Sequence, residues 1–423
     1  MTDIRPFRGV RYDPKRVELS KVIVPPYDVI SDAQRGTYYD RDPHNAIRFE
    51  LTRDPRDQAT TDYHEIREWL DAWRASGVLV RDDEPALYVM RQTFEHGGHR
   101  YSRTGFFAAL ALAEYGEGKV LRHERTLAKP IADRLRLLEA ARANLSSAFL
   151  LYRDEAGELE ELLAAALERA PLGRAVDDGG VEYEVGRLGG DDAARVCRFL
   201  ASRSVVIADG HHRYQTALEY RNRRRAAGAA ADAPSEATLA FFANADAEGS
   251  LLLPIHRAIV EVPAPDDATW RERLPGWSCR SVRLEGAASI EAVLAAELAP
   301  HAGEAAFAAD DGSGVLRVFT RAEPLGDALI VDVVERDVIR GVFGLGDTEI
   351  AGGGVEFFKQ AEAAAAAVRE GAVSVALYLN PVAVEDVFRV ARAGGVMPQK
   401  STFFHPKVPT GIVFRTHDPE DGA

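Results

Sequence analysis

The sequence predicts a fold of mixed α/β (α+β) class. Segments typical of strands alternate with segments typical of helices between residues 101 and 262, and they do so again after residue 263. Of the 423 residues, 46% are hydrophobic, which is enough to bury a sizeable core in two or three domains. Since no apolar run reaches the ~18 residues of a membrane-spanning helix, we expect a soluble protein.

The first hundred residues are predicted to be a region of their own that begins irregularly. Paired prolines cannot donate hydrogen bonds to a sheet, so residues 24–30 are expected to be an extended loop. Apolar residues three and four positions apart predict a helix over residues 62–76. Residues 87–94 and 100–107 are predicted to be the strands of a hairpin, because a His-Gly-Gly turn lies between them.

Two further domains are expected after residues 1–100, namely residues 101–262 and residues 263–423, with prolines at their boundary. In the first of these, helices are predicted over residues 131–143, 159–170, 191–202 and 214–227, and strands over residues 181–187, 204–208 and 239–243. In the second, strands are predicted over residues 315–319 and 373–379, and helices over residues 334–343, 356–369 and 384–393.

The charge balance bears on partners and compartment. The 52 Lys and Arg residues against 66 Asp and Glu residues give a net charge of −14, the opposite sign from a general nucleic-acid binder. The N-terminus is polar and lacks a secretory signal, so the cytoplasm is the expected compartment. We therefore expect a small-molecule substrate and neither nucleic acid nor membrane as a partner, while the sequence leaves the oligomeric state open.

Several common catalytic motifs are missing from the chain. It has no G-x-x-x-x-G-K loop followed by Ser or Thr, and no glycine-spaced dinucleotide fingerprint after a strand. It has neither a G-x-S-x-G elbow nor an H-E-x-x-H helix. The ordinary P-loop, Rossmann, hydrolase and zinc-protease interpretations are therefore disfavoured.

The segment richest in chemical groups is the loop at the end of the strand predicted over residues 204–208, where the chain enters a helix. Gly210 permits a tight turn, and the helix start exposes backbone N–H groups at its positive end. His211, His212 and Arg213 add donors there, which suits a phosphate group. Asp209 could hold Mg²⁺ or serve only as the helix N-cap. A capped turn without function is the structural alternative.

A second polar cluster precedes the helix predicted over residues 131–143. Glu124 is a candidate general base or metal ligand, and Lys129 and Arg134 could neutralise anionic groups of a substrate. His123 and Thr126 lie beside Glu124 and are candidate substrate-binding residues. The structural alternative is that several basic residues of this helix are simply solvated.

Weaker candidates lie elsewhere in the chain. They are Tyr27-Asp28, the His-Arg pair at His256-Arg257, and the polar stretch over residues 397–407. Within that stretch, Lys400-Ser401-Thr402 is suspected to reach the pocket.

Five motifs along nearly the whole chain occur in a characteristic order: Pro25-Pro26-Tyr27-Asp28-Val29-Ile30, His123-Glu124-x-Thr126, Asp209-Gly210-His211-His212-Arg213-Tyr214, Pro254-x-His256-Arg257 and Met397-Pro398-x-Lys400-Ser401-Thr402. Together they resemble the bacterial family catalogued as domain of unknown function 1015. The family name assigns no function.

The central region in turn resembles the ParB/sulfiredoxin-like fold, and its nearest motif match is to the free serine kinases. This resemblance implies that residues 209–213 hold nucleotide phosphates and that Glu124 is the upstream catalytic glutamate. Sulfiredoxin chemistry is not implied, because that activity needs a cysteine where this loop has histidine.

The resulting prediction is a Mg²⁺-dependent phosphotransferase that converts a small hydroxy-amino acid, free L-serine first of all, to its phosphate ester. The predicted catalytic residues are Glu124, Asp209 and His212, with Asp209 holding the metal. The predicted donor-binding residues are Gly210, His211, His212, Arg213 and Lys129, and the predicted substrate-binding residues are His123, Thr126 and Arg134. ATP, ADP and pyrophosphate remain open as donors. The alternatives are a nucleotide-binding module without transfer and a hydrolase of small phosphorylated metabolites.

Overall fold

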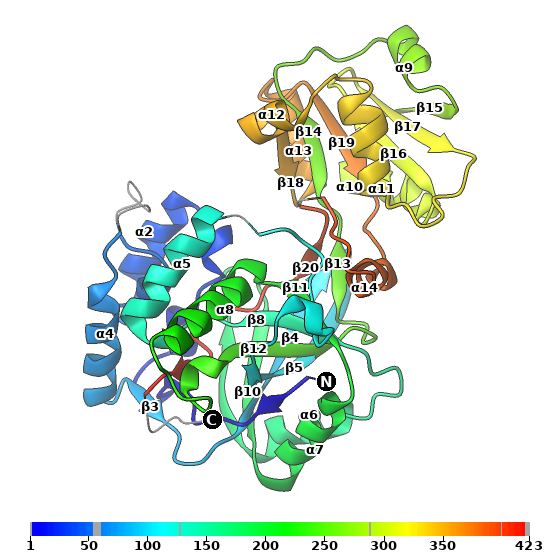
Figure 1. The fold of residues 1–423 in the computed structure, drawn as a ribbon. Coiled ribbons are helices and arrows are strands. Elements are labelled where there is room, and N and C mark those ends of the chain that lie inside the picture. The colour runs from blue at the N-terminus through cyan, green and yellow to red at the C-terminus, as the bar shows by residue number, and fades with distance from the viewer. Residues whose placement is uncertain (1, 54–60, 127, 287–288, 399, 419–423) are drawn as a thin grey trace. The chain divides into compact units, whose positions relative to one another are not determined.

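The computed structural model describes residues 2–53, 61–126, 128–286, 289–398 and 400–418 (Figure 1). The chain divides into unit 1, Met1–Leu251 with Pro406–Ala423, and unit 2, Leu252–His405. Unit 2 is therefore an insertion, after which the chain returns to unit 1. This division differs from the three expected domains, because the expected boundary after residue 100 lies inside strand β5 (His99–Ala111). Both units combine helices with sheets, so the predicted fold class is confirmed.

Unit 1 is built on a nine-stranded mixed sheet. Its strands run in the order β6-β11-β8-β12-β5-β4-β10-β9, with β1 paired to β5. The predicted hairpin is confirmed, and its turn residues Gly97 and Gly98 both have the positive φ that a tight hairpin turn requires. The strands are β1 (Ile4–Arg5), β4 (Leu87–His96), β5, β6 (Val120–Leu121), β8 (Ala148–Tyr152), β9 (Pro171–Val176), β10 (Glu182–Leu188), β11 (Val205–Asp209) and β12 (Ala237–Asn244).

The helices predicted within unit 1 are confirmed, with small shifts at their ends. Apolar residues of α6, α7 and α8 pack on one face of the sheet around Phe106 and Phe242, and α5 lies beside α8 (Figure 1). The helices of unit 1 are α1 (Leu19–Val22), α2 (Asp32–Arg41), α3 (Ile47–Glu50), α4 (His64–Ala75), α5 (Ala128–Ala141), α6 (Glu160–Arg169), α7 (Gly190–Ala201) and α8 (His211–Ala226), with short turns η1 (Tyr27–Val29), η2 (Tyr115–Glu117) and η3 (Pro234–Glu236).

A second core in unit 1 joins the N-terminal helices to the end of the chain. Phe414 is fully buried there beside Phe49 and Tyr12. Strand β21 (Arg415–Thr416) pairs with β7 (Ala143–Asn144), and single bridges join Val24 to Thr410 and Val10 to Phe414. A further small sheet consists of β2 (Val10–Tyr12) and β3 (Leu79–Arg81). The returning segment is therefore an integral part of unit 1.

Unit 2 contains a six-stranded antiparallel sheet in the order β15-β17-β16-β19-β14-β18. Helices α10 and α13 bury alanine and leucine side chains against this sheet. The sheet strands are β14 (His256–Ile259), β15 (Trp277–Arg283), β16 (Ala305–Asp310), β17 (Val315–Arg321), β18 (Val355–Phe358) and β19 (Val375–Leu379); β13 (Leu251–Leu253) pairs with β20 (Phe403–His405). The helical elements are α9 (Asp267–Arg273), α10 (Ile290–Glu297), η4 (Ala299–His301), α11 (Ile330–Val334), η5 (Glu335–Arg340), α12 (Asp347–Glu349), η6 (Ile350–Gly354), α13 (Ala361–Arg369) and α14 (Val384–Arg392).

Two helix predictions in unit 2 need correction. The helix predicted over residues 356–369 begins only at Ala361, because the preceding residues form β18 and pair with β14. The helix predicted over residues 334–343 is instead α11 followed by the π-helical segment η5. In the first case strand pairing with distant residues overrides the local helical pattern.

Among the described residues, no helix has both the length and the apolar character of a membrane span.

Candidate functional site

The loop between β11 and α8 has a conformation that requires glycine. Residues Val205–Ile207 of the strand are fully buried, and Gly210 then adopts φ 82°, in the left-handed region. A Cβ at Gly210 would also lie 2.9 Å from Nε of Arg213. Gly210 is itself the N-cap of α8 and makes no side-chain cap, so the interpretation of Asp209 as the N-cap is wrong.

Asp209 pairs with two cations. One of its oxygens accepts from Nη2 of Arg213 at 2.5 Å, and the other accepts from Nζ of Lys407. Burial by itself would raise the pKa of Asp209, but the charges of Lys407 and Arg213 hold it well below its usual range. Arg213 also donates to the backbone carbonyl of Ser147. Asp209 therefore holds two cationic side chains next to the first turn of α8.

The same contacts bear on the predicted magnesium ligand. Both carboxylate oxygens of Asp209 already accept hydrogen bonds from cations. Among the described residues there is also no group of three or more His, Cys, Asp or Glu side chains that could hold a metal ion. The described residues thus do not fit a metal ion held by protein ligands alone, and Asp209 serves here as the partner of Lys407 and Arg213.

Glu124 lies at the start of α8, far from the loop in sequence. Its Oε2 atom is 3.9 Å from Nδ1 of His211, and its side chain is 29% exposed. The ring of His123 meets the ring of His211 edge to face, with centroids 4.7 Å apart. The structure thus brings together three of the predicted site residues, His123, Glu124 and His211, from two separate segments.

Both histidines of this pair are buried, and burial disfavours the protonated form of each ring. Burial lowers the pKa of His123 to about 4, although a hydrogen bond to the backbone of Ile207 and the charge of Asp209 act the other way. Burial, together with the charge of His123, holds the pKa of His211 well below its ordinary value. Among the residues that the structure describes, Nε2 of His211 has no hydrogen-bond partner although it is buried. That atom can serve a bound ligand.

Acid is expected to destabilise unit 1 through His123. The unfolded chain takes up a proton below pH ~6.5, whereas folded His123 does so only at about pH 4. The stabilisation is therefore complete above pH ~6.5 and is lost as the pH falls toward 4, by on the order of 3 kcal/mol. Urea denaturation at several pH values should show a shallower pH dependence in His123→Gln than in the wild type. Equal slopes in the two proteins would contradict this assignment.

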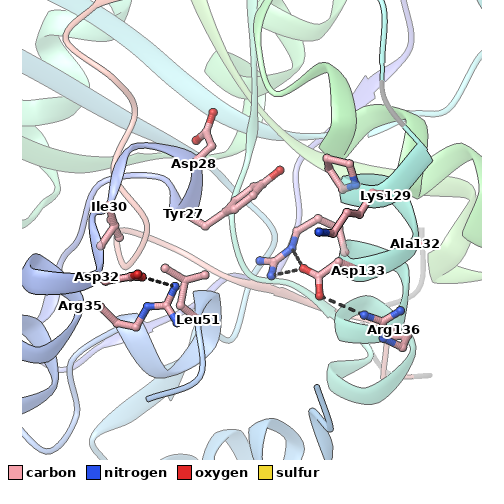
Figure 2. A pocket seen from close by; sticks show the side chains of 12 residues that line it. Tyr27, Asp28, Ile30, Asp32, Arg35, Leu51, Lys129, Ala132, Asp133 and Arg136 are labelled. Carbon is pink, nitrogen blue, oxygen red and sulfur yellow. Dashed lines mark hydrogen bonds and ion pairs between the residues drawn. The ribbon is translucent and has the colours of Figure 1, made fainter. Parts of the chain in front are cut away.

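A pocket of about 480 Å³ lies between η1, α2 and α5 (Figure 2). Most of its charged groups pair with one another. Arg35 pairs with Asp32 at 3.3 Å, and Asp133 pairs with both arginines of α5 in the pocket. The lining residues are Tyr27, Asp28, Ile30, Asp32, Arg35, Leu51, Lys129, Pro130, Ala132, Asp133, Arg134 and Arg136.

Two charged side chains of this pocket stand apart. Within the described part of the chain, neither Asp28 nor Lys129 has an ion-pair partner, and both are exposed. Figure 2 shows the Tyr27 side chain pointing from η1 toward Lys129 on α5. Asp28 lies next to Tyr27 on η1. The pocket lining therefore includes one negative and one positive side chain without an ion-pair partner among the described residues.

Charges of the pocket act on Arg213 at the start of α8. Burial lowers the pKa of Arg213, but the charges of Asp209 and Asp28 more than reverse this. In turn, burial raises the pKa of Tyr27 to about 12, with Arg134 and Arg213 acting the other way. The energy between two charges falls as the distance between them grows, so only charged groups close to Arg213 and Tyr27 change their pKa values noticeably. The charges at the start of α8 and in the pocket therefore act on one another.

Arg134, which was predicted to bind substrate, lines the pocket and is paired within the protein. Its guanidinium is buried, donates to the backbone carbonyl of Glu50 at 2.8 Å, and pairs with Asp133 at 2.6 Å. It also lies over the ring of Tyr27, 4.3 Å from the ring centroid. Because its donors are engaged within the protein, Arg134 shapes the pocket wall rather than presenting a free cation to a substrate.

The other predicted residues have various positions. His212 is half-buried in the first turn of α8, Lys129 lines the pocket, and Thr126 is half-buried but does not line it. Lys400 belongs to unit 2, whereas Lys407 from the same polar stretch reaches Asp209.

Sequence reasoning missed Glu50, Gln92 and Arg103, which support this region. No local sequence pattern singles them out.

Comparisons with known proteins place these observations in context. A family model described as "Protein of unknown function (DUF1015)" matches residues 4–294. No curated protein matches the chain. Similar solved structures include a conserved hypothetical protein from Pyrococcus furiosus, with 16% identity, 74% of this chain and 95% of that chain covered, and a TM-score of 0.35.

Two further similar solved structures carry specific protein names. A mutant free serine kinase in complex with ADP is 14% identical, covers 73% of this chain and 92% of its own, and has a TM-score of 0.36. SbnI with a C-terminal truncation, from Staphylococcus aureus, is 12% identical, with 71% and 84% covered and a TM-score of 0.35.

Proposed function

The chain belongs to the DUF1015 family of proteins of unknown function, and from its own site we propose that it is a kinase for a small hydroxy-amino acid. In this proposal a phosphoryl group passes from a nucleotide or pyrophosphate to the hydroxyl of free L-serine. The observation that carries the proposal is the position of Glu124, 3.9 Å from His211 at the start of α8, where Asp209 pairs with Arg213 and Lys407. A carboxylate base and a phosphate-binding helix start with nearby cations are among the parts that phosphoryl transfer uses.

The start of α8 is the donor side of the site. The backbone N–H groups of a helix's first turn and the helix dipole favour a phosphate group. Nε2 of His211 adds a buried hydrogen-bonding atom there, and Arg213 and Lys407 supply positive charge. Phosphoryl transfer depends on positioning and charge neutralisation more than on covalent chemistry, so such a set is sufficient.

Glu124 is the proposed general base. Its carboxylate is partly exposed, so an acceptor hydroxyl can reach it, and His211 contacts it from the protein side. It would orient the hydroxyl and take its proton as the oxygen attacks phosphorus. The scheme requires no metal ion held by protein side chains. Magnesium bound to the donor is a separate variable of the assay.

The pocket supports an amino acid as the acceptor. An amino acid carries an ammonium group and a carboxylate, and Asp28 and Lys129 are the groups of opposite charge that remain unpaired in the described pocket. At about 480 Å³ the pocket is within the usual range for small-molecule sites.

The test is phosphorus NMR of the purified protein with L-serine and each of ATP, ADP and pyrophosphate, with and without Mg²⁺. A new phosphomonoester signal that matches O-phosphoserine is expected with at least one donor. Release of inorganic phosphate alone would indicate a hydrolase. Donor binding without any turnover would indicate a binding module.

The same assay probes the pocket. Removal of the charge in Lys129→Met or Asp28→Asn is expected to raise KM for serine about tenfold, because a charge-assisted hydrogen bond is lost. Lys129, which the sequence predicts to bind the donor, binds the acceptor in this proposal, so donor affinity should change little. Lys15→Met, which alters an exposed lysine outside the pocket, is the matched control. An unchanged KM in both pocket variants would place the acceptor elsewhere.

A further inference from the structure

Lys407 enters the site from the segment that returns to unit 1. Unit 2 is inserted between Leu251 and Pro406, so Lys407 is the second residue after the return. Its side chain is 15% exposed and its ammonium group contacts Asp209. The proposed function above gives this lysine a place near the donor but does not explain why it is there.

Buried side chains fix the backbone of Lys407. Its carbonyl accepts from Nε2 of Gln92 at 3.0 Å, and the carbonyl of Pro406 accepts from Arg103. Arg103 is fully buried, and its Nε donates to Oε1 of Gln92 at 3.1 Å. A buried arginine that donates to a backbone carbonyl fixes the position of that backbone. The base of the Lys407 side chain is therefore held rigidly.

The ammonium end of the Lys407 side chain, in contrast, can change its partner. A lysine ammonium group is a compact charge on a flexible four-carbon stem. Asp209 is shared by Lys407 and Arg213, so the three side chains together carry a net positive charge beside the start of α8. Arg213 is held at a second point by the carbonyl of Ser147. A phosphate that arrives there competes with Asp209 for the ammonium group.

We propose that Lys407 is a further catalytic residue, whose ammonium group moves from Asp209 to the phosphate of the donor and stays with the transferring group. This inference rests on the proposed kinase function for the transfer step, while the contact with phosphate can be tested without it.

The step balances without further reactants. The bond between the transferring phosphorus and the leaving group breaks, and the leaving group departs with the electron pair. A bond forms between phosphorus and the acceptor oxygen, whose proton passes to Glu124. Lys407 stays protonated throughout and neutralises charge on the phosphoryl oxygens.

The first experiment measures pyrophosphate binding by titration calorimetry. Lys407→Met is expected to bind pyrophosphate about 10- to 100-fold more weakly than the wild type, since a charge-assisted contact is lost. Lys407→Arg keeps the charge and is expected to recover part of the affinity. The control is Lys119→Met, which alters a lysine paired with Glu117 at 2.6 Å. Equal affinity of the folded Lys407→Met variant and the wild type would overturn the proposal.

A second measurement needs no variant. Saturating pyrophosphate is expected to protect Lys407 of the wild-type protein from acetylation, as followed by mass spectrometry, while Lys119 reacts as before. Unchanged acetylation of Lys407 would overturn the proposal. If phosphorus NMR shows no transfer by the wild type, the kinase function fails, but these two measurements still decide whether Lys407 binds the donor phosphate.

Discussion

Replacement of Glu124 by glutamine is expected to lower kcat for serine phosphorylation by about 100- to 10,000-fold, the usual contribution of a general base. Glutamine has nearly the same shape as glutamate but cannot accept the hydroxyl proton. Because Glu124 lies beside the donor-binding atoms rather than among them, donor affinity should stay within about twofold. Phosphorus NMR gives the rate, and calorimetry with ADP or pyrophosphate gives the affinity.

The control for Glu124 is Glu117→Gln, which removes the charge of an exposed glutamate paired with Lys119. It should leave both the rate and the affinity unchanged. An equal loss of rate and donor binding in Glu124→Gln would mean that Glu124 supports the fold or binds the donor directly. A wild-type rate would remove Glu124 from the mechanism.

Replacement of Arg134 by methionine is expected to cost about 3–5 kcal/mol of unfolding free energy, the range for loss of one partner of a buried ion pair. Arg134 and Glu50 are both almost completely buried, and methionine would leave the Glu50 carboxylate without its cation. Asp133 and the hydroxyl of Tyr63 would lose a partner as well. Urea denaturation followed by circular dichroism measures the change.

Arg136→Met is the matched comparison for Arg134, since both side chains pair with Asp133 from the same helix. The Arg136 side chain is 37% exposed, so its loss is expected to cost less than about 1 kcal/mol. If the two variants lost the same stability, burial would not be what makes the Arg134 network strong.

Local patterns were sufficient for much of the fold. The helix spacing over residues 62–76 and the glycine turn of the β4–β5 hairpin depend on neighbours in sequence, and both predictions are confirmed. Strand β8 was not predicted, because a short apolar run is equally compatible with a buried helix segment. Its identity as a strand comes from pairing with β11 and β12, which are distant in sequence.

In the candidate site, too, contiguous residues could be predicted from the sequence and long-range contacts could not. Residues 209–213 are contiguous, so their chemistry and the need for glycine could be predicted from the sequence alone. The pairing of Glu124 with this loop came from the resemblance of motifs. Neither the local pattern nor the motif resemblance predicts the ion pairs of Lys407 with Asp209 and of Arg134 with Glu50, because no local pattern links residues so far apart in sequence.

By itself the sequence determined the α/β class, most of the element types in unit 1, and a phosphate-suited loop at the start of α8, because periodicity, glycine conformation and helix ends act over a few residues. The tertiary structure decided that unit 2 is an insertion, that Asp209 pairs with two cations, and that Arg134 is used internally. These outcomes depend on strand pairing and burial, which bring distant charges together and determine which of them stay available to a ligand.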